Sequence, residues 1–515
     1  MKQLRLFAIA ALALVSTSCV EDWLREKSPM TTEVSDFFTS SQTAVQVTNA
    51  AYAPLGWEYQ GTYYSEFFFG DILSDDALKG GQNVTDGSDA YQLDNFKILD
   101  NNAIVLQYYR AQYQGISRAN LALEQIEMME TSEDDLTPEL KNRLLAEAHF
   151  LRAYYYFRLV RLYGGVPVVT TPVYSSNQWI QPRASAAEVY ELILSDLKFA
   201  EQYLPLKSEY ASEDLGRATK GAAQAMLLKV SLYTHDFAAA KTYGEAFIND
   251  QASEYDLCFD YADNFTLAGE NGVESVFEVQ YMEEGTSDYG EGNGFSRGTF
   301  TTILTRSRSS AFANPGWGFN RPSKSLYDEF EAGDPRRDAT ILVPKESEIV
   351  TPSEEIYLGN SMIGIKRTIF DPATRTYSAL AHDARAAANK IEIRLADVYL
   401  MYAEACIEQG DLATAASFIE RVRDRVGLNP VEANTKETLT AALRHERRCE
   451  LAMEGHRWFD ICRWGIADQV MNAYKASENE EVRAEMGDFV KGKHELMPIP
   501  YEEVRMGKLE QNPGY

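Results

Sequence analysis

The chain has 515 residues, a formal net charge of −28 at pH 7, and 30 tyrosines, 24 phenylalanines and 6 tryptophans. Such an acidic chain repels phosphate backbones, so the charge argues against nucleic acid as a partner but is compatible with a neutral ligand. The 5 cysteines are few for this length and lack the spacing of a disulfide framework. The length is typical of about three domains, although large single folds often depart from that rule.

Residues 1–18 have the pattern of a bacterial export signal, in which Lys2 and Arg5 precede an apolar stretch that ends in small residues. The apolar stretch is about ten residues long, which is too short to span a membrane as a helix. We therefore predict a signal peptide here and exclude it from the folded protein.

Cys19 follows the small residues directly, as the lipidated cysteine of a lipobox does, although Ser16 stands where leucine is usual. Ordinary secretion with an incidental cysteine is the alternative. In the lipobox interpretation, residues 19–40 comprise the lipidated cysteine and a tether. Several acyl chains at one site anchor a protein to a membrane without a spanning segment.

Helical periodicity is strong in the first half of the chain. Apolar residues in 144–162 recur at steps of three and four, which predicts a helix that ends at Gly164 and carries its arginines on other faces. A second helix is predicted over residues 185–204, because Ser185 and Glu188 form a capping box and a proline follows the segment.

Two segments resemble helical hairpins of one kind. Residues 221–248 and 398–422 each place large and small residues where the paired helices of tetratricopeptide repeats approach closely. Residues 56–114 and roughly 250–390 are different, because they are rich in Gly, Asn, Asp, Pro and aromatic residues and contain only short strand-like runs such as 275–281. Long loops inside a compact chain are usually functional, so we expect the site there.

Aromatic residues concentrate in two of these loop segments, GWEYQGTYYSEFFF at 56–69 and NPGWGF at 314–319. An exposed ring presents an apolar face that matches the C–H face of a sugar. Packing in the core is the alternative for each ring, and we expect it for the three consecutive phenylalanines of the first segment. The candidate ligand-binding residues are Trp57, Tyr59, Tyr63, Tyr64, Trp317 and Phe319.

Two patterns resemble metal sites. Residues 71–89 are dense in oxygen ligands, but they lack the alternation of an EF-hand, so a solvated acidic loop is the favoured interpretation. A second set matches no established zinc spacing, which favours core cysteines and hydrogen-bonded histidines. That set is His445, Cys449, His456 and Cys462. We predict no metal site and no cofactor, with calcium as the one ion left open.

Catalytic motifs are absent from the sequence, which contains neither H-E-x-x-H nor G-x-S-x-G. Carboxylates are so abundant that counting cannot exclude a glycosidase pair. The segment 442–465 predicts a helix with Glu446, Glu450 and Glu454 at steps of four, interleaved with arginines. Such a pattern lines a site in some proteins, but an internal ion-pair lattice is the favoured interpretation.

A series of segments resembles the SusD/RagB family of Bacteroidetes outer-membrane lipoproteins, in the same order along the chain. The resemblance extends from about residue 30 to the last residue. The segments are LLAEAHFLRAYYYFRLVRLYGGVPVV, EVYELILSDLKFAEQYLP, GRATKGAAQAMLLKVSLY, RPSKSLYDEFEAGDPRRD, IEIRLADVYLMYAEA, HERRCELAMEGHRWFDICRWG, HELMPIPYEEV and QNPGY.

The resemblance implies a mostly α fold in which four tetratricopeptide-like helical pairs form a scaffold, and long, loop-rich, partly β excursions carry the ligand site. It divides the chain into an N-terminal helical region at 41–250 with an aromatic loop insert and a C-terminal region at 251–515. The second region has a loop-rich insert at 251–390 and helical pairs at 391–465. We expect both regions to form one compact fold.

The resemblance also implies a cell-surface lipoprotein of the outer membrane that has no enzymatic activity. Such a protein binds an oligosaccharide or polysaccharide and delivers it to a SusC-like TonB-dependent transporter. Glu21 and Asp22 resemble the family's acidic signal for export to the surface. Ligand-binding rings lie in the family's variable loops, so the six aromatic candidates remain hypotheses from loop position and ring type. The alternatives are a RagB-like peptide-binding lid of such a transporter and a surface enzyme that acts on glycans.

Replacing Cys19 by serine is expected to move the protein from the membrane fraction to the soluble fraction, because the thioether that holds the lipid cannot form. Fractionation followed by immunoblotting measures the change. Mass spectrometry of the mature wild-type amino terminus is the control, and an unmodified Cys19 there would contradict the anchor.

Overall fold

The computed structural model describes residues 38–175, 178, 180–283, 298–349, 361–378 and 386–515. The predicted signal peptide, Cys19 and all but the last residues of the predicted tether lie outside the described residues. No helix in the described ranges combines the length and the apolar character needed to cross a membrane.

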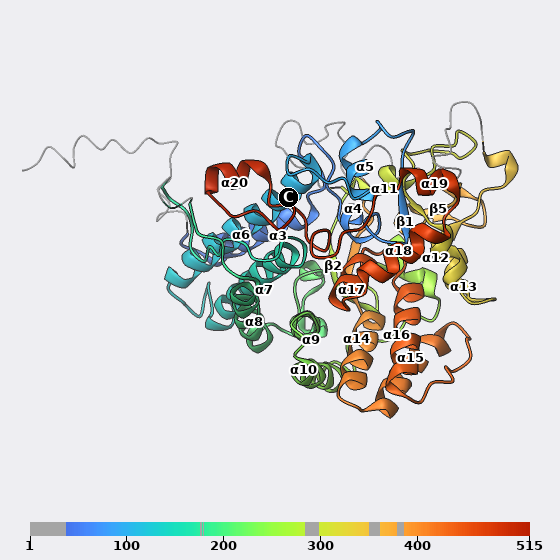
Figure 1. The fold of residues 1–515 in the computed structure, drawn as a ribbon. Helices are drawn as coiled ribbons and strands as arrows, with labels where there is room; N and C mark the ends of the chain where they lie inside the picture. Colours follow the sequence, from blue (N-terminus) through green and yellow to red (C-terminus); the bar gives the residue numbers. More distant parts are fainter. Residues whose placement is uncertain (1–37, 176–177, 179, 284–297, 350–360, 379–385) are drawn as a thin grey trace, which may run out of the picture.

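Four helical pairs form the scaffold and follow one another along the chain. Each pair also packs against the next, through α6 and α7, α8 and α9, and α10 and α14. The pairs occupy the left and lower parts of the molecule in Figure 1. They confirm the predicted mostly α fold. Their members are α3 (Ser41–Tyr52) with α6 (Ala103–Met128), α7 (Pro138–Tyr163) with α8 (Ala186–Tyr203), α9 (Lys220–Tyr233) with α10 (Phe237–Asp250), and α14 (Leu395–Glu408) with α15 (Leu412–Arg425).

From Leu144 onward, the helix α7 is buried on nearly all sides. It ends at Gly164, which has a φ of +71°, as the sequence predicts. Its arginines do not lie on exposed faces, however. Arg152 donates to Asp196 of α8 at 2.7 and 2.8 Å, and Arg158 pairs with Glu392 at 2.6 Å. Periodicity alone missed this burial, because an ion pair lets a charged side chain enter a core.

Small residues allow the helices to approach closely. A Cβ atom on Gly115 of α6 would lie 2.3 Å from the Tyr155 ring of α7. A Cβ atom on Gly244 of α10 would lie equally close to Tyr402 of α14. Neither contact lies within a predicted hairpin, since the first is outside both and the second joins one hairpin to the other. Both show the large-to-small packing that lets helices of successive pairs approach closely.

Two loop-rich inserts interrupt the scaffold. The first lies between α3 and α6 and ends before Ala103, so residues 103–114 are helical rather than part of the predicted loop. It contains η1 (Ala53–Gly56), α4 (Phe67–Gly70), β1 (Ala77–Gly80) and α5 (Ser88–Asp94). The second lies between α10 and α14. Its regular elements are β2 (Ser275–Val279), α11 (Thr301–Thr305), β3 (Phe319–Pro322), α12 (Lys324–Glu329), α13 (Pro335–Thr340), β4 (Ile341–Leu342), β5 (Ile363–Gly364), β6 (Phe370–Asp371), β7 (Thr376–Tyr377) and β8 (Lys390–Arg394).

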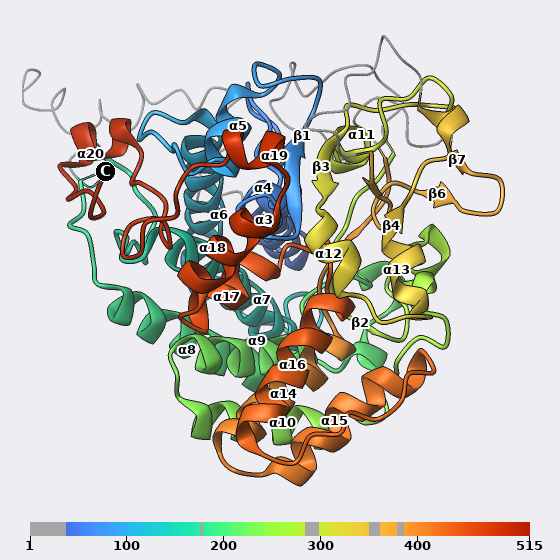
Figure 2. The same cartoon turned by 45° about the vertical axis from the view of Figure 1, so that its right-hand side comes forward.

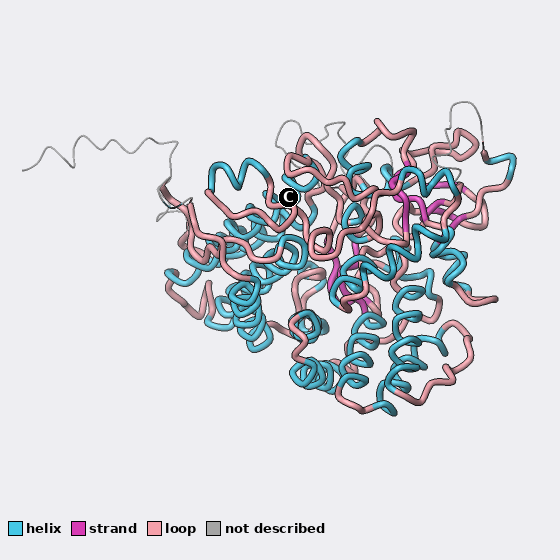
Figure 3. The backbone as a smooth tube through the Cα atoms, viewed as in Figure 1, coloured by secondary structure: helices cyan, strands magenta, loops and turns pink. Residues whose placement is uncertain are grey.

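The two inserts meet through an antiparallel strand pair. Strand β1 of the first insert pairs with β3 of the second, with Ala77 opposite Pro322 and Gly80 opposite Phe319. Figure 2 shows these two strands side by side, with α11 close to β3. The other pairs, β2 with β8, β4 with β5 and β6 with β7, lie within the second insert. Loops therefore dominate one side of the molecule and helices the other (Figure 3).

Helices of the C-terminal segment close the structure. They are α16 (Lys436–Glu450), α17 (Arg457–Arg463), α18 (Ala467–Ser477), α19 (Glu480–Glu485) and α20 (Tyr501–Gly507). The predicted single helix through Glu454 is wrong, because α16 ends at Glu450 and a turn follows in which Gly455 has a φ of +82°.

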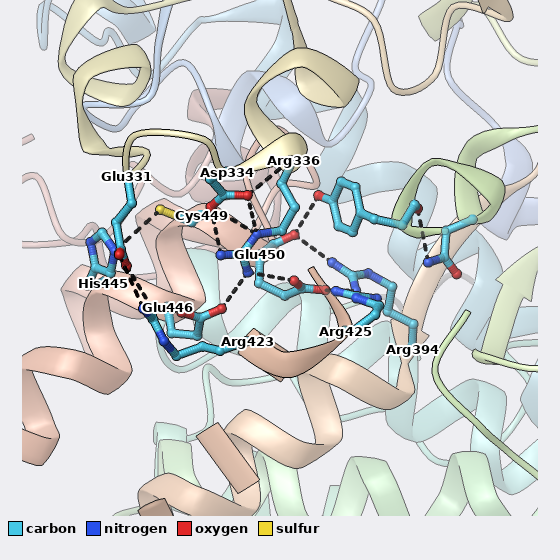
Figure 4. Close-up of polar contacts among 12 residues, drawn as sticks. Glu331, Asp334, Arg336, Arg394, Arg423, Arg425, His445, Glu446, Cys449 and Glu450 are labelled. Atoms are coloured by element: carbon cyan, nitrogen blue, oxygen red, sulfur yellow. Dashed lines mark hydrogen bonds and ion pairs between the residues drawn. The ribbon is translucent and has the colours of Figure 1, made fainter. Parts of the chain in front are cut away.

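A buried ion-pair lattice joins α16 to the second insert and to α15 (Figure 4). Glu450 of α16 contacts Arg336 of α13 at 2.9 Å and also contacts Arg394 at the end of β8 and Arg425 of α15. Arg394 in turn pairs with Glu274 at 2.8 Å. The side chains of all these residues are almost completely buried. The predicted internal lattice is confirmed.

Replacing Glu450 by alanine is expected to lower the free energy of unfolding by about 3–5 kcal/mol, because it leaves buried guanidinium groups without their partner. Chemical denaturation measures the change. Glu502→Ala is the matched control, since Glu502 forms an exposed ion pair with Arg110 and should cost less than about 1 kcal/mol. Equal losses in the two variants would contradict this role of the lattice.

Candidate functional site

Four aromatic rings gather where the two inserts meet, and we call them the ring cluster: Tyr59, Tyr63, Phe300 and Trp317. Tyr59 stacks on Phe300 with ring centroids 5.5 Å apart, and Tyr63 lies 4.9 Å from Tyr59. Trp317 meets Tyr63 edge to face at 5.2 Å. Phe300 is buried, whereas the other three rings are partly exposed. Phe300 is therefore the base of the cluster, and the other rings reach the surface.

A tight turn places the two tyrosines on one face. Tyr59 and Tyr63 form an antiparallel bridge, and Gly61 between them has a φ of +79°. The N–H of Tyr64 donates to the carbonyl of Glu58 at 2.9 Å, which closes the turn. Residues opposite one another on an antiparallel pair project to the same side.

Glycines on both sides of Trp317 allow its backbone to lie against α11. The Trp317 N–H donates to the carbonyl of Ile303 at 2.8 Å. A Cβ atom on Gly316 would lie 2.3 Å from the same carbonyl oxygen, and Gly318 has a φ of +71°. The sequence NPGWGF is thus explained by a close approach of two backbone segments.

Polar groups border Trp317. Arg308 donates from Nη1 to the Trp317 carbonyl at 3.1 Å and to the Asp86 carboxylate at 3.4 Å. Both side chains are partly exposed. They place a guanidinium group and a carboxylate beside the rings, within reach of the hydroxyls of a bound ligand.

The other three aromatic candidates are covered. Tyr64, Phe319 and Trp57 are only 2%, 6% and 8% exposed, so their rings offer little surface to a ligand in this structure. The Lys79 ammonium lies 5.3 Å from the centre of the Phe319 ring. The Arg118 guanidinium lies 4.7 Å from the centre of the Trp57 ring. Trp57 borders a separate cavity of about 530 Å³.

A smaller cavity is lined in part by Thr301 and Thr305 of α11. Its volume is about 60 Å³, far below the ~300 Å³ of a small ligand pocket. It is large enough for water but not for a sugar ring. The surface formed by the rings is therefore a better candidate for a large ligand than this small cavity.

The oxygen-rich segment 71–89 is organised around a lysine. The Lys79 ammonium donates to the carbonyls of Asn83 at 2.9 Å and Asp86 at 2.7 Å. Burial lowers the pKa of Lys79 to about 8. Asp75 and Asp76 pair with Arg448. Arginine and lysine thus use many of the oxygens that a calcium ion would need.

The histidine and cysteine set is not arranged as a metal site. The Nδ1 atom of His445 contacts Glu329 at 2.7 Å, and the Nε2 atom of the same histidine lies 3.9 Å from the Cys449 thiol. Burial holds the pKa of Cys449 well above its usual range, which leaves the thiol protonated and unreactive. Within the described ranges, no three His, Cys, Asp or Glu side chains are placed to share a metal ion.

Comparisons with known proteins agree with the architecture. Residues 22–232 match a family described as "Starch-binding associating with outer membrane", and residues 360–515 match the SusD family. The SusD-like protein P2 of Formosa agariphila is 28% identical over 473 residues, which cover 86% of this chain and 87% of that protein. The starch-binding protein SusD of Bacteroides thetaiotaomicron is 23% identical over 99% of this chain and 98% of its own length.

Solved structures share the fold over almost the whole chain. A laminarin-binding SusD-like protein superposes with a TM-score of 0.78 at 29% identity, covering 93% of this chain and 100% of its own. The surface glycan-binding protein A from Bacteroides fluxus gives a TM-score of 0.80 at 24% identity with the same coverage. Both the N-terminal and the C-terminal part of the chain match SusD family descriptions, and the relatives align over most of both chains. This chain therefore belongs to the SusD/RagB family.

Proposed function

We propose that the protein is a surface glycan-binding protein that holds an oligosaccharide on the exposed faces of the ring cluster. The observation that carries the proposal is the convergence of Tyr59, Tyr63 and Trp317, which come from two distant segments and remain partly exposed together. Aromatic rings beside charged hydrogen-bonding groups suit a ligand with apolar C–H faces and many hydroxyls. The laminarin-binding relative supports the same class of ligand.

The rings do not form a flat surface, because the Tyr63 and Trp317 planes meet at 79°. A chain that bends between sugar units can contact both rings, whereas a straight, ribbon-like chain cannot. Hydrated sugars lose good contacts with water when they bind, which limits the net gain. We expect micromolar or weaker affinity, equivalent to about −8 kcal/mol or a smaller magnitude.

A binding role is favoured over an enzymatic one. In the described part of the chain, the acidic residues Glu58 and Asp86 lie near the rings, and both are engaged. Glu58 is buried among hydrogen-bond donors, and Asp86 pairs with Arg308. A glycosidase needs one carboxylic acid and one carboxylate that flank the scissile bond. Three of the similar proteins are named for binding, namely the surface glycan-binding protein A, the laminarin-binding SusD-like protein and the starch-binding protein SusD, which supports the same conclusion.

Delivery to a SusC-like TonB-dependent transporter completes the proposal. The family membership, the family description that mentions the outer membrane and the predicted lipid on Cys19 support a position at the cell surface. In that position the ring cluster would capture glycans that are too large to diffuse through the membrane.

Replacing Trp317 or Tyr63 by alanine is expected to weaken glycan binding about tenfold or more, because each variant removes a stacking face. Calorimetry with laminarin, followed by affinity electrophoresis against a polysaccharide panel, measures the loss. Tyr501→Ala is the matched control, since Tyr501 is an exposed ring on α20. It should bind within about twofold of the wild type.

The same protein tests the alternatives. Unchanged affinity in both ring variants would move the site away from the cluster. Binding of a peptide pool with no binding of any glycan would favour a peptide lid, and steady release of shorter glycans by the purified protein would show an enzyme.

A further inference from the structure

Glu58 lies directly before Tyr59 in the sequence, yet its side chain is buried, with 6% exposed. Its Oε2 atom accepts hydrogen bonds from the Thr299 hydroxyl at 2.7 Å, the Phe300 N–H at 2.6 Å and the Thr301 N–H at 3.1 Å. Its Oε1 atom accepts from the Thr301 hydroxyl at 2.7 Å. One carboxylate therefore binds four donors from three consecutive residues of the other insert.

The Phe300 and Thr301 N–H groups both donate to this carboxylate of the other insert, and the Thr301 N–H also donates to the Thr299 hydroxyl of its own segment at 3.1 Å. The N–H groups of Phe300 and Thr301 lie at the start of α11, where a helix has no carbonyl of its own to offer them. A buried N–H group without an acceptor costs about 1–3 kcal/mol. Glu58 satisfies both groups at once.

Arg367 balances the buried charge. Its Nη2 atom lies 3.8 Å from Glu58 Oε1 and donates to the Thr299 hydroxyl at 3.3 Å. A buried carboxylate that is both hydrogen-bonded and close to a cation fixes the groups around it.

The same residue also organises its own segment. The Glu58 carbonyl accepts the Tyr64 N–H that closes the turn carrying Tyr59 and Tyr63. Its carboxylate holds Phe300, on which Tyr59 stacks. Trp317 is positioned in turn, because its N–H donates to the carbonyl of Ile303 in α11, the short helix that begins directly after Phe300.

We infer that Glu58 is the positioning residue of the ring cluster: it fixes the distances and angles between the tyrosines of the first insert and the Phe300–Trp317 side of the second. It contacts no ligand itself. The inference rests on the proposed function for its effect on affinity, but its structural effect is independent of any ligand.

Glu58→Ala is expected to weaken laminarin binding roughly tenfold to a hundredfold, because small misplacements of contact groups are costly. Hydrogen–deuterium exchange of the ligand-free protein should show faster exchange in Phe300, Thr301 and Trp317. Glu58→Gln should restore affinity to within about threefold, since its amide oxygen can replace Oε2 and its NH₂ can donate to the Thr301 hydroxyl.

Glu404→Ala is the matched control. Glu404 is also 6% exposed and accepts hydrogen bonds from Arg463 at 2.7 Å and from the Trp464 indole at 3.0 Å, within the scaffold and the C-terminal helices. This variant should lose stability without a change in laminarin affinity or in exchange at residues 299–301. If Glu58→Ala does not fold, Thr301→Val removes one of the four donors and should give a smaller change in the same direction.

The outcomes separate this inference from the proposed function. If Trp317→Ala loses laminarin binding while Glu58→Ala binds and exchanges like the wild type, the positioning role is overturned and the site stands. If Glu58→Ala speeds exchange at residues 299–301 and none of the ring variants changes affinity, Glu58 holds the two inserts together but the ring cluster is not the binding site.

Discussion

Buried carboxylates hold the loop-rich side of the molecule onto its helical scaffold. Where the structure describes them, the inserts contain few regular hydrogen bonds of their own, since their longest strands there have only 5 residues. Side chains must therefore satisfy many of the buried donors. Glu66 of the first insert contacts Arg158 and Arg161 of α7 and Lys390 of β8. Glu450 likewise contacts arginines of α13, β8 and α15.

Asp71 is a further buried carboxylate that connects the two inserts. It accepts hydrogen bonds from the Asn320 side chain and the Gly455 N–H, each at 2.9 Å, and so joins both inserts to the turn after α16. Burial raises the pKa of Asp71 to about 7. In the described part of the chain, no guanidinium group contacts Asp71 to offset this effect. Glu58 extends the same principle to the ring cluster. The rings thus take their positions from residues that touch no ligand.

Local sequence patterns predicted the scaffold well. The period of the apolar residues predicted the course of α7, and the capping box at Ser185 predicted the start of α8. Both signals act over a few residues, which is why they can be read directly.

Long-range contacts were beyond such patterns. Phe300 and the role of Glu58 were missed, because their partners lie some 240 positions apart in the sequence. Trp57 was proposed as a ligand ring, but Arg118 of α6 covers it, and nothing near Trp57 in the sequence announces this contact. The end of α16 before Glu454 was also missed, because the pattern of apolar and charged residues continues through the turn that follows the helix.

A crystal structure of the protein with a laminarin-derived oligosaccharide would show whether the ring cluster binds glycan. We expect sugar rings against the faces of Tyr63 and Trp317, with hydroxyls hydrogen-bonded to Arg308, and an unchanged Glu58 beneath them. An oligosaccharide bound in the cavity beside Trp57, with no sugar on the ring cluster, would contradict this expectation.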